Sequence, residues 1–389
     1  MRVSNVNSVS LTAVLGAGLL AFSALPAHAI AFKITNLVSD GFVPAKTIDP
    51  DLINPWGMSY GPTGPFWVSD NDAGVTTLYN GAGTKIALTV AIPPPGGSTD
   101  IGHPTGQVFN GSGGFNVTSG GKTASSFFMF ASEDGTISGW APSVDVTHAI
   151  LAVDNSAGGA GAVYKGLAIG SSGGSNFIYA ANFRSGEVEM YDSSFSLVNS
   201  FTDPGVAAGY APFNVQNLGG ELYVSFALQN ADKHDDVAGP GNGYVDVFNP
   251  DGTFNRRLVS LGGAINSPWG LDIAPASFGK FAGDLLVGNF GDGTIGAFDP
   301  LTGAFKGDLL GKDGLPLVLG DLWGLINGNG TTGDINTVYF TAGLVDEAHG
   351  LFGSITAVPE PATWALMLIG LGGLGGARRS RRRAIAATA

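Results

Sequence analysis

The sequence predicts an all-β protein, a six-bladed β-propeller, and three observations support this fold class. Six segments repeat one pattern at spacings of 48 to 60 residues. Each segment opens on a short lead that ends in Gly or Asn, and alternating apolar strands separated by Gly-rich turns follow it. Gly accounts for 62 of the 389 residues, so helical propensity is poor. Small antiparallel sheets repeated in a ring bury each other's faces, which makes a single domain of residues 30–357.

The leads mark the start of each blade. Their final residues are Gly57, Gly106, Gly166, Asn214, Gly270 and Gly324. We expect the residue before each of these to crowd the central channel, and those residues are Trp56, Thr105, Lys165, Phe213, Trp269 and Trp323. The aromatic side chains suit two interpretations, either platforms that stack on sugar rings or packing between blades.

Ring closure is also visible in the sequence. The last repeat lacks a fourth strand after "GLFGSITAV", and the apolar segment 32–38 stands unused before the first lead. We therefore expect residues 32–38 to form the outermost strand of the blade that ends near Ala357. This pairing ties the two ends of the domain together and removes a free sheet edge.

The N-terminal segment 1–29 has the features of a secretory signal peptide. Arg2 precedes an apolar stretch over 9–25, and Ala27-His28-Ala29 follows as a cleavage site. The mature chain is expected to begin at Ile30. It contains no cysteine, and a domain of this length buries enough apolar surface to fold without disulfides.

Charge narrows the classes of partner. Residues 30–357 hold 12 basic and 30 acidic residues, a formal charge of −18. Such a surface repels phosphate backbones, which argues against nucleic acid and against direct adsorption to anionic lipid. Divalent cations, neutral glycans and basic partners remain compatible with it.

The C-terminal segment 358–389 reads as a sorting signal. An apolar run of 15 residues spans about 22 Å as a helix, which is short of the roughly 30 Å hydrocarbon core and favours transient membrane insertion. An ordinary single-span anchor held by its arginines is the alternative. The segment contains Pro359, Glu360, Pro361, Arg378, Arg379, Arg381, Arg382 and Arg383. It resembles the PEP-CTERM sorting signal of Gram-negative bacteria, which implies recognition by an exosortase, cleavage near Pro-Glu-Pro, and association with the cell envelope or exopolysaccharide matrix.

The body of the chain resembles a family of PEP-CTERM-associated propeller proteins. The similarity rests on "NLVSDG", "NPWGM", "GPFWVSDN" and "KHDDVAGPGNGYVDVFNPDG" and covers most of residues 36–357. It implies the fold and the sorting class, and no activity.

Ionisable residues gather on one predicted face, where each lead begins and each second strand ends. Strand ends there carry Asp70, Glu133, Asn182 and Asn289. The longest loop of the same face carries Asp232, His234, Asp235 and Asp236. Oxygen-rich loops suit calcium, so Asp232, Asp235 and Asp236 are candidate ligands. The alternative is that these side chains cap turns in solvated loops.

These observations favour a non-catalytic binding protein for a glycan, a cation or a protein ligand, with no required cofactor. A second hypothesis is a calcium-dependent lactonase. The chain resembles six-bladed NHL or lactonase-like propellers of the gluconolactonase type, in which Asp, Asn and Glu at the channel mouth hold calcium. It departs from them because Trp, Thr, Lys and Phe occupy the positions before the lead glycines. We expect the tail to leave from the face opposite the candidate site.

Overall fold

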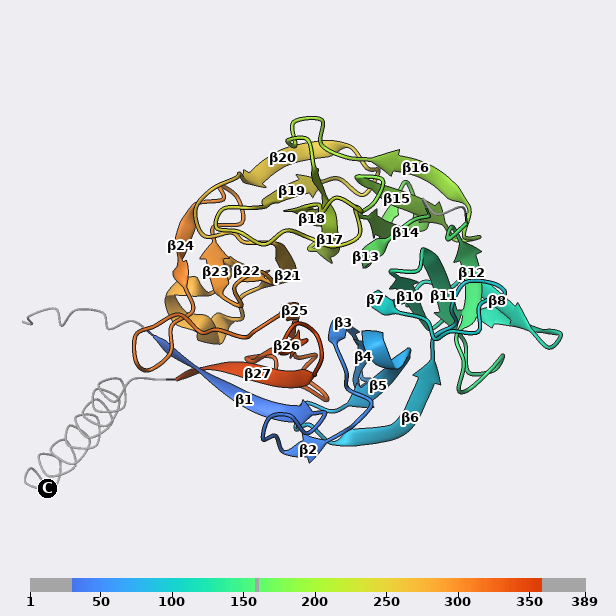
Figure 1. Cartoon of the computed structure of the whole chain (residues 1–389), viewed down its shortest axis with the longest axis horizontal. Helices are drawn as coiled ribbons and strands as arrows, with labels where there is room; N and C mark the ends of the chain where they lie inside the picture. Colours follow the sequence, from blue (N-terminus) through green and yellow to red (C-terminus); the bar gives the residue numbers. More distant parts are fainter. Residues whose placement is uncertain (1–29, 158–160, 359–389) are drawn as a thin grey trace, which may run out of the picture.

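The computed structural model describes residues 30–157 and 161–358, which form a ring of six sheets (Figure 1). The first blade contains β3 (Pro55–Ser59), β4 (Phe66–Asp70), β5 (Val75–Tyr79) and β6 (Lys85–Ala91). The second contains β7 (Pro104–Phe109), β10 (Phe128–Ser132), β11 (Thr136–Trp140) and β12 (Ile150–Asp154). The third contains β13 (Tyr164–Ser172), β14 (Ser175–Asn182), β15 (Glu187–Asp192) and β16 (Leu197–Phe201).

The other three blades complete the ring. The fourth contains β17 (Tyr210–Leu218), β18 (Glu221–Leu228), β19 (Tyr244–Phe248) and β20 (Phe254–Val259). The fifth contains β21 (Pro268–Ile273), β22 (Leu285–Asn289), β23 (Ile295–Phe298) and β24 (Phe305–Asp308). The sixth contains β25 (Leu322–Asn327), β26 (Val338–Ala342), β27 (Leu351–Val358), β1 (Ala31–Ser39) and β2 (Thr47–Ile48). The predicted six-bladed propeller is confirmed.

Closure of the ring uses the N-terminal strand, as the sequence predicts. Strand β1 pairs antiparallel with β27, and Phe32 lies opposite Ala357. The Phe32 side chain is buried, and its ring centroid lies 4.8 Å from that of Phe278 in the short 3-10 helix η2 (Ala276–Phe281) of the fifth blade. The outermost strand of the last blade therefore also packs against its neighbour.

The lead glycines are explained by contacts between blades. A Cβ atom on Gly106 would lie 2.2 Å from the backbone nitrogen of Leu167, and one on Gly57 would lie 2.5 Å from the carbonyl oxygen of Thr105. Asn214 stands at the same position of the fourth blade. Its amide donates a 2.7 Å hydrogen bond to the carbonyl oxygen of Trp269, so a side-chain bond there replaces a close backbone approach.

Two insertions vary the repeat. A hairpin of β8 (Asn116–Ser119) and β9 (Lys122–Ser125) lies between β7 and β10, which accounts for the longest spacing between leads. The loop 229–243 separates β18 from β19 without disturbing the four-stranded fourth blade. A short 3-10 helix, η1 (Asn71–Ala73), follows β4.

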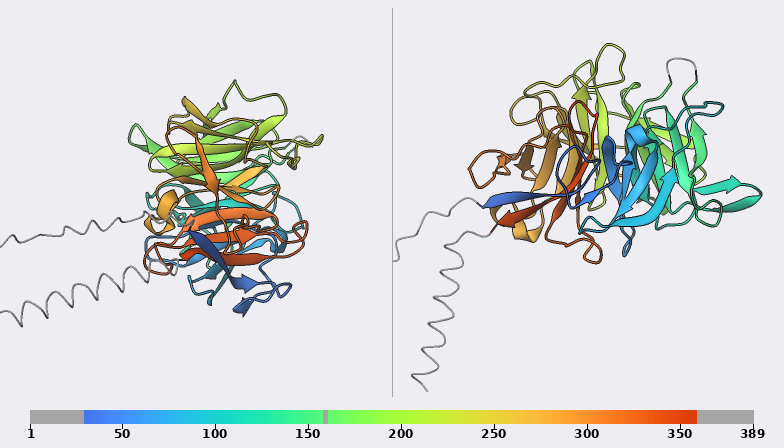
Figure 2. Two further views of the ribbon diagram at one scale, coloured as in Figure 1. Left: turned by 90° about the vertical axis from the view of Figure 1, so that its left-hand side faces the viewer. Right: turned by 60° about the horizontal axis from the view of Figure 1, so that its bottom comes forward.

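The strand directions define two ends of the channel. We call the end where the innermost strands begin the upper mouth, and the end where they finish the lower mouth. The loop after each second strand opens at the upper mouth, since that strand returns antiparallel to the first. Strand β27 runs the opposite way and ends beside the start of β1 at the lower mouth (Figure 2). The chain thus leaves the propeller on the side predicted, away from the candidate site.

The predicted signal peptide and the sorting residues from Pro359 onward lie outside the described residues. Within the described ranges, no helix has the length and apolar character needed to cross a membrane.

Candidate functional site at the upper mouth

A buried aromatic cluster fills the channel beneath the upper mouth. The rings of Trp56 and Trp323 stack with centroids 3.4 Å apart, and Trp269 meets both edge-on. All three indoles are at most 2% exposed, and Phe213 belongs to the same cluster. Of the two interpretations of these residues, the structure favours packing, because their faces contact one another and are not open to a sugar ring.

Lys165 precedes the lead glycine of the third blade, as the three Trp residues do in their own blades. Its ammonium places a positive charge against the aromatic cluster. Its ammonium lies 5.0 Å from the ring centroid of Trp56, and its side chain is 3% exposed. The ammonium donates a hydrogen bond to Glu133 Oε1 and lies 3.5 Å from Asp235 Oδ1. Burial alone would lower the pKa of Lys165, but the charge of Glu133, followed by that of Asp235, raises it above its usual value. A buried ammonium therefore stays charged at the centre of the mouth.

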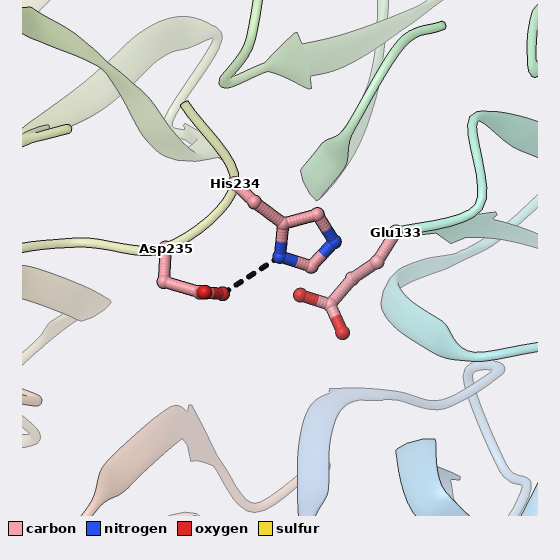
Figure 3. Close-up of side chains that lie close together, drawn as sticks. All are labelled: Glu133, His234 and Asp235. Atoms are coloured by element: carbon pink, nitrogen blue, oxygen red, sulfur yellow. Dashed lines mark hydrogen bonds and ion pairs between the residues drawn. The ribbon is translucent and has the colours of Figure 1, made fainter. Parts of the chain in front are cut away.

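Three side chains from two blades meet at the upper mouth (Figure 3), and two of them, Glu133 and Asp235, contact Lys165. Glu133 follows β10, and His234 and Asp235 lie in the loop after β18. His234 Nδ1 lies 2.7 Å from Asp235 Oδ1, and this hydrogen bond, together with the charge of Lys165, lowers the pKa of Asp235 to about 2. The amide of Asn71 donates a 3.1 Å hydrogen bond to the other oxygen of Glu133.

A strained loop brings a third carboxylate, that of Glu347, to the upper mouth. Val345, Asp346 and Glu347 have consecutive positive φ angles of 60°, 50° and 67°. Left-handed backbone is unfavourable for residues with a Cβ, and such strain concentrates at functional sites. Burial, and then the charge of Glu133, raise the pKa of Glu347 to about 7. Its Oε2 accepts a 2.6 Å hydrogen bond from the amide of Asn54. Among the described residues, no cationic side chain forms an ion pair with Glu347.

A cleft lies beside the mouth, between the loops of the third and fourth blades. Its volume is about 670 Å³. Its polar lining consists of Asn182, Arg184, Ser185, Asp232 and Lys233. Neutral, cationic and anionic side chains that donate or accept hydrogen bonds therefore face one cleft.

Only one of the four predicted strand-end residues, Glu133, joins the charged group. Asp70 is fully buried and accepts a hydrogen bond from Thr77. The side-chain oxygen of Asn182 accepts a hydrogen bond from the backbone N–H of Val163. The side-chain oxygen of Asn289 accepts one from the backbone N–H of Asn266. These three positions support turns of their own blades, which is the alternative that the sequence left open, although Asn182 also lines the cleft.

The predicted calcium ligands are not brought together as a set. Among the described residues, the group whose His, Asp and Glu ligand atoms all lie within 4.8 Å is Glu133, His234 and Asp235, without Asp232 and Asp236. Asp232 is exposed in the cleft, and burial raises the pKa of Asp236. With Lys165 in place the group does not fit calcium, because the ammonium already lies against both of its carboxylates and calcium needs six to eight oxygen ligands.

Sequence reasoning did not select Glu347 or Asn54. The loop that carries Glu347 is acidic, but its left-handed turn of non-Gly residues leaves no sequence signature. Asn54 precedes the Pro-Trp-Gly lead, and its own positive φ of 46° turns it toward Glu347. Asn is enriched in that conformation, so the residue type alone was a weak indication of a left-handed backbone at position 54.

Comparison with known proteins adds the sorting motif and the family. Residues 357–383 match the PEP-CTERM protein-sorting motif. Among solved structures, a streptogramin B lyase is 11% identical with a TM-score of 0.46, covering 85% of this chain and 98% of that chain. A catalytically inactive virginiamycin B lyase from Staphylococcus aureus with quinupristin is 13% identical with a TM-score of 0.48, covering 85% and 100%.

The propeller and its C-terminal motif define a PEP-CTERM-sorted β-propeller protein. The motif implies processing by an exosortase and marks the chain as exported and sorted to the cell surface. The chain belongs to a family that includes two proteins of Acanthamoeba polyphaga mimivirus. Uncharacterized protein L690 is 35% identical, covering 85% of this chain and 87% of that protein. Uncharacterized protein R648 is 34% identical, covering 83% and 80%.

Proposed function

We propose that the chain is a non-catalytic binding protein of the Gram-negative cell envelope or its extracellular matrix. Its upper mouth binds a ligand that carries both amino and hydroxyl groups, such as a chain of amino sugars. The observation that carries this proposal is the excess of negative charge over Lys165. Glu133 and Asp235 share one ammonium, and Glu347 adds a carboxylate without an ion pair among the described residues.

The ligand class follows from this arrangement. A cationic amine compensates the Glu347 carboxylate, and hydrogen bonds that involve a charged group are the stronger class. Hydroxyl groups suit the cleft, because amide, hydroxyl and charged side chains there offer both donors and acceptors. An acidic or phosphorylated ligand is disfavoured by the mouth and by the −18 formal charge of residues 30–357.

The orientation of the chain supports binding outside the cell. Strand β27 ends at the lower mouth, so the sorting segment attaches on the side away from the candidate site. A propeller held by that segment keeps the upper mouth open to the surroundings. Ligand capture at the surface is compatible with this geometry.

The test compares two sugars that differ at the 2-amino group, which is a free ammonium in one and a neutral acetamide in the other. Residues 30–357 are titrated calorimetrically with glucosamine oligomers and with the matched N-acetylglucosamine oligomers. We expect the amine form to bind at least about tenfold more tightly, since a hydrogen bond to a charged group contributes about 1.5–3 kcal/mol. Glu347→Gln should remove most of that difference, whereas Asp313→Asn, at an exposed loop acid, should not. Equal binding of the two sugars, or no binding of either, contradicts the proposal.

A calcium-dependent lactonase is the second candidate, and the group of Glu133, His234 and Asp235 is what favours it. A metal there has to displace Lys165 from two carboxylates. Lactone turnover that a chelator abolishes would support this candidate. A melting temperature unaffected by calcium, together with inertness across a panel of lactones, would remove it.

A further inference from the structure

A second cavity opens at the lower mouth, at the opposite end of the channel from the candidate site. Its volume is about 370 Å³. Innermost strands of five blades line it, and its walls are largely apolar, with Tyr60, Phe109, Ile169 and Ile326 among them. Small-molecule sites have volumes of about 300–1,000 Å³ and apolar walls with a few polar groups. The cavity fits that description.

The fifth blade contributes a carboxylate to this end of the channel. Asp272 stands two residues after the lead Gly270. In the other five blades the equivalent residues all line the cavity, and they are Ser59, Val108, Ala168, Gln216 and Ile326. The repeat therefore places Asp272 at the corresponding position of the fifth blade. Asp272 is not among the residues that line the cavity, but burial and then the charge of Asp272 raise the pKa of Tyr60, which is one of them.

Asp272 is buried without a cation. It is 9% exposed, and its Oδ1 accepts a 2.8 Å hydrogen bond from the backbone N–H of Ile273. Its Oδ2 is buried with no hydrogen-bond partner. Among the described residues, no cationic side chain forms an ion pair with this carboxylate. An isolated buried carboxylate is costly, so this oxygen is a point where a ligand could gain free energy.

A second unpartnered acceptor lies beside it. The side-chain nitrogen of Asn327 donates a 2.7 Å hydrogen bond to the carbonyl oxygen of Ile273, while its Oδ1 is buried with no partner. The backbone N–H of Asn327 also acts on the Asp272 carboxylate, so both side chains lie where the fifth and sixth blades meet. When Asp272 is ionised the two unfilled groups are both acceptors, and a ligand that donates hydrogen bonds can satisfy them.

We propose that the lower mouth binds a small organic ammonium with an apolar body. The ammonium donates to Asp272 Oδ2 and Asn327 Oδ1, and the apolar body packs against Phe109, Ile169 and Ile326. An ammonium fits better than a metal ion, because calcium needs six to eight oxygen ligands and two are unfilled here. The site is separate from the upper mouth and does not depend on the function proposed there.

The experiment uses two probes of nearly equal size and shape, phenethylamine and 2-phenylethanol. Each is titrated into residues 30–357 while thermal unfolding is followed. We expect the amine to raise the melting temperature and the alcohol to have little effect, because a ligand that binds the native state stabilises it. Asp272→Asn should weaken amine binding at least about tenfold. Asp251→Asn removes an exposed acid from the β19–β20 turn and should bind like the parent protein.

A structural readout keeps the proposal testable if Asp272→Asn folds poorly. Crystals of the parent protein soaked with 4-bromophenethylamine should show the anomalous signal of bromine at the lower mouth. The proposal is overturned if the parent protein fails to distinguish the amine from the alcohol, if the folded Asp272→Asn variant binds as tightly as the parent, or if the bromine lies elsewhere. Since Glu347→Gln leaves this end of the channel unchanged, loss of either site can be recognised separately.

Discussion

The ammonium of Lys165 lies 3.5 Å from the Asp235 carboxylate, and the two residues come from different blades. Lys165 belongs to the innermost strand of the third blade, and Asp235 to the long loop of the fourth. The same ammonium donates to Glu133 of the second blade. One buried cation of the third blade therefore links loops of the second and fourth blades at the upper mouth.

Replacing this cation should destabilise the protein and create a response to metal. Lys165→Met keeps the length of the side chain but leaves Glu133 and Asp235 without their cation. Removing one partner of a buried ion pair costs about 3–5 kcal/mol. Added calcium should then raise the melting temperature of the variant much more than that of the parent protein, because it restores a positive charge between the carboxylates.

Lys233→Met is the matched control for this variant. Lys233 lies in the same loop as Asp235 but is exposed, so the substitution should change stability by less than about 0.5 kcal/mol and leave the calcium response unchanged. Thermal melts with and without calcium measure both effects. A Lys165→Met protein as stable as the parent would show that the ion pair does not organise the mouth.

The lead glycines should be intolerant of even one methyl group. In Gly106→Ala, the added Cβ would lie 2.2 Å from the backbone nitrogen of Leu167 in the next blade. Overpacking of this kind costs about 1–3 kcal/mol and more where backbone has to move. Gly320→Ala is the control, since nothing lies within 4 Å of its added Cβ. Denaturant unfolding should separate the two variants, and equal midpoints would contradict the proposed packing.

Ring closure should depend on Phe32. Its side chain is 2% exposed and packs against Phe278 and Phe281. Phe32→Ala should lower the free energy of unfolding by about 3–5 kcal/mol. Phe127→Ala, at a side chain that is 51% exposed, should cost far less. If the two variants unfold at the same denaturant concentration, β1 does not contribute to closure as described.

The fold could be predicted because its determinants repeat. A Gly or Asn at the end of each lead, alternation along each strand and a missing fourth strand are local features, and six copies made the pattern visible. The hairpin of β8 and β9 could not be predicted in the same way, because an insertion has no counterpart in the other blades. It was noticeable only as a longer spacing between leads.

The site was predicted less completely, because its contacts cross between blades. The strand directions predicted that Glu133 and Asp235 lie on one face, and in the structure they meet at the upper mouth. The partner of both, Lys165, was selected only as a channel residue, since no local pattern shows that a side chain reaches an acid of another blade. Glu347 depends on a left-handed turn that only tertiary contacts stabilise.

Stability should fall as pH rises through the neutral range, and Asp272 should account for part of this fall. Burial raises the pKa of Asp272 from 3.8 to about 7 in the folded protein. Between these values the native state binds more protons than the unfolded state, so the free energy of unfolding decreases with rising pH. The contribution is fully present near pH 4 and is lost above about pH 7.

Asp272→Asn isolates this contribution. The amide is neutral at every pH, so the variant should match the parent protein near pH 4 and exceed it at pH 8 by about 4 kcal/mol, the free energy that corresponds to the shift in pKa. Because Glu347 and Asp246 also have pKa values of about 7, both proteins should still lose stability over this range. The quantity to measure is therefore the difference between their denaturant unfolding free energies at the two pH values.

Asp251→Asn should show no gain at pH 8, since hydrogen bonds from Thr253 lower the pKa of that exposed acid. An Asp272→Asn protein less stable than the parent at pH 8 would mean that the carboxylate has a partner in solution, and a bound cation at the lower mouth is the first one to look for.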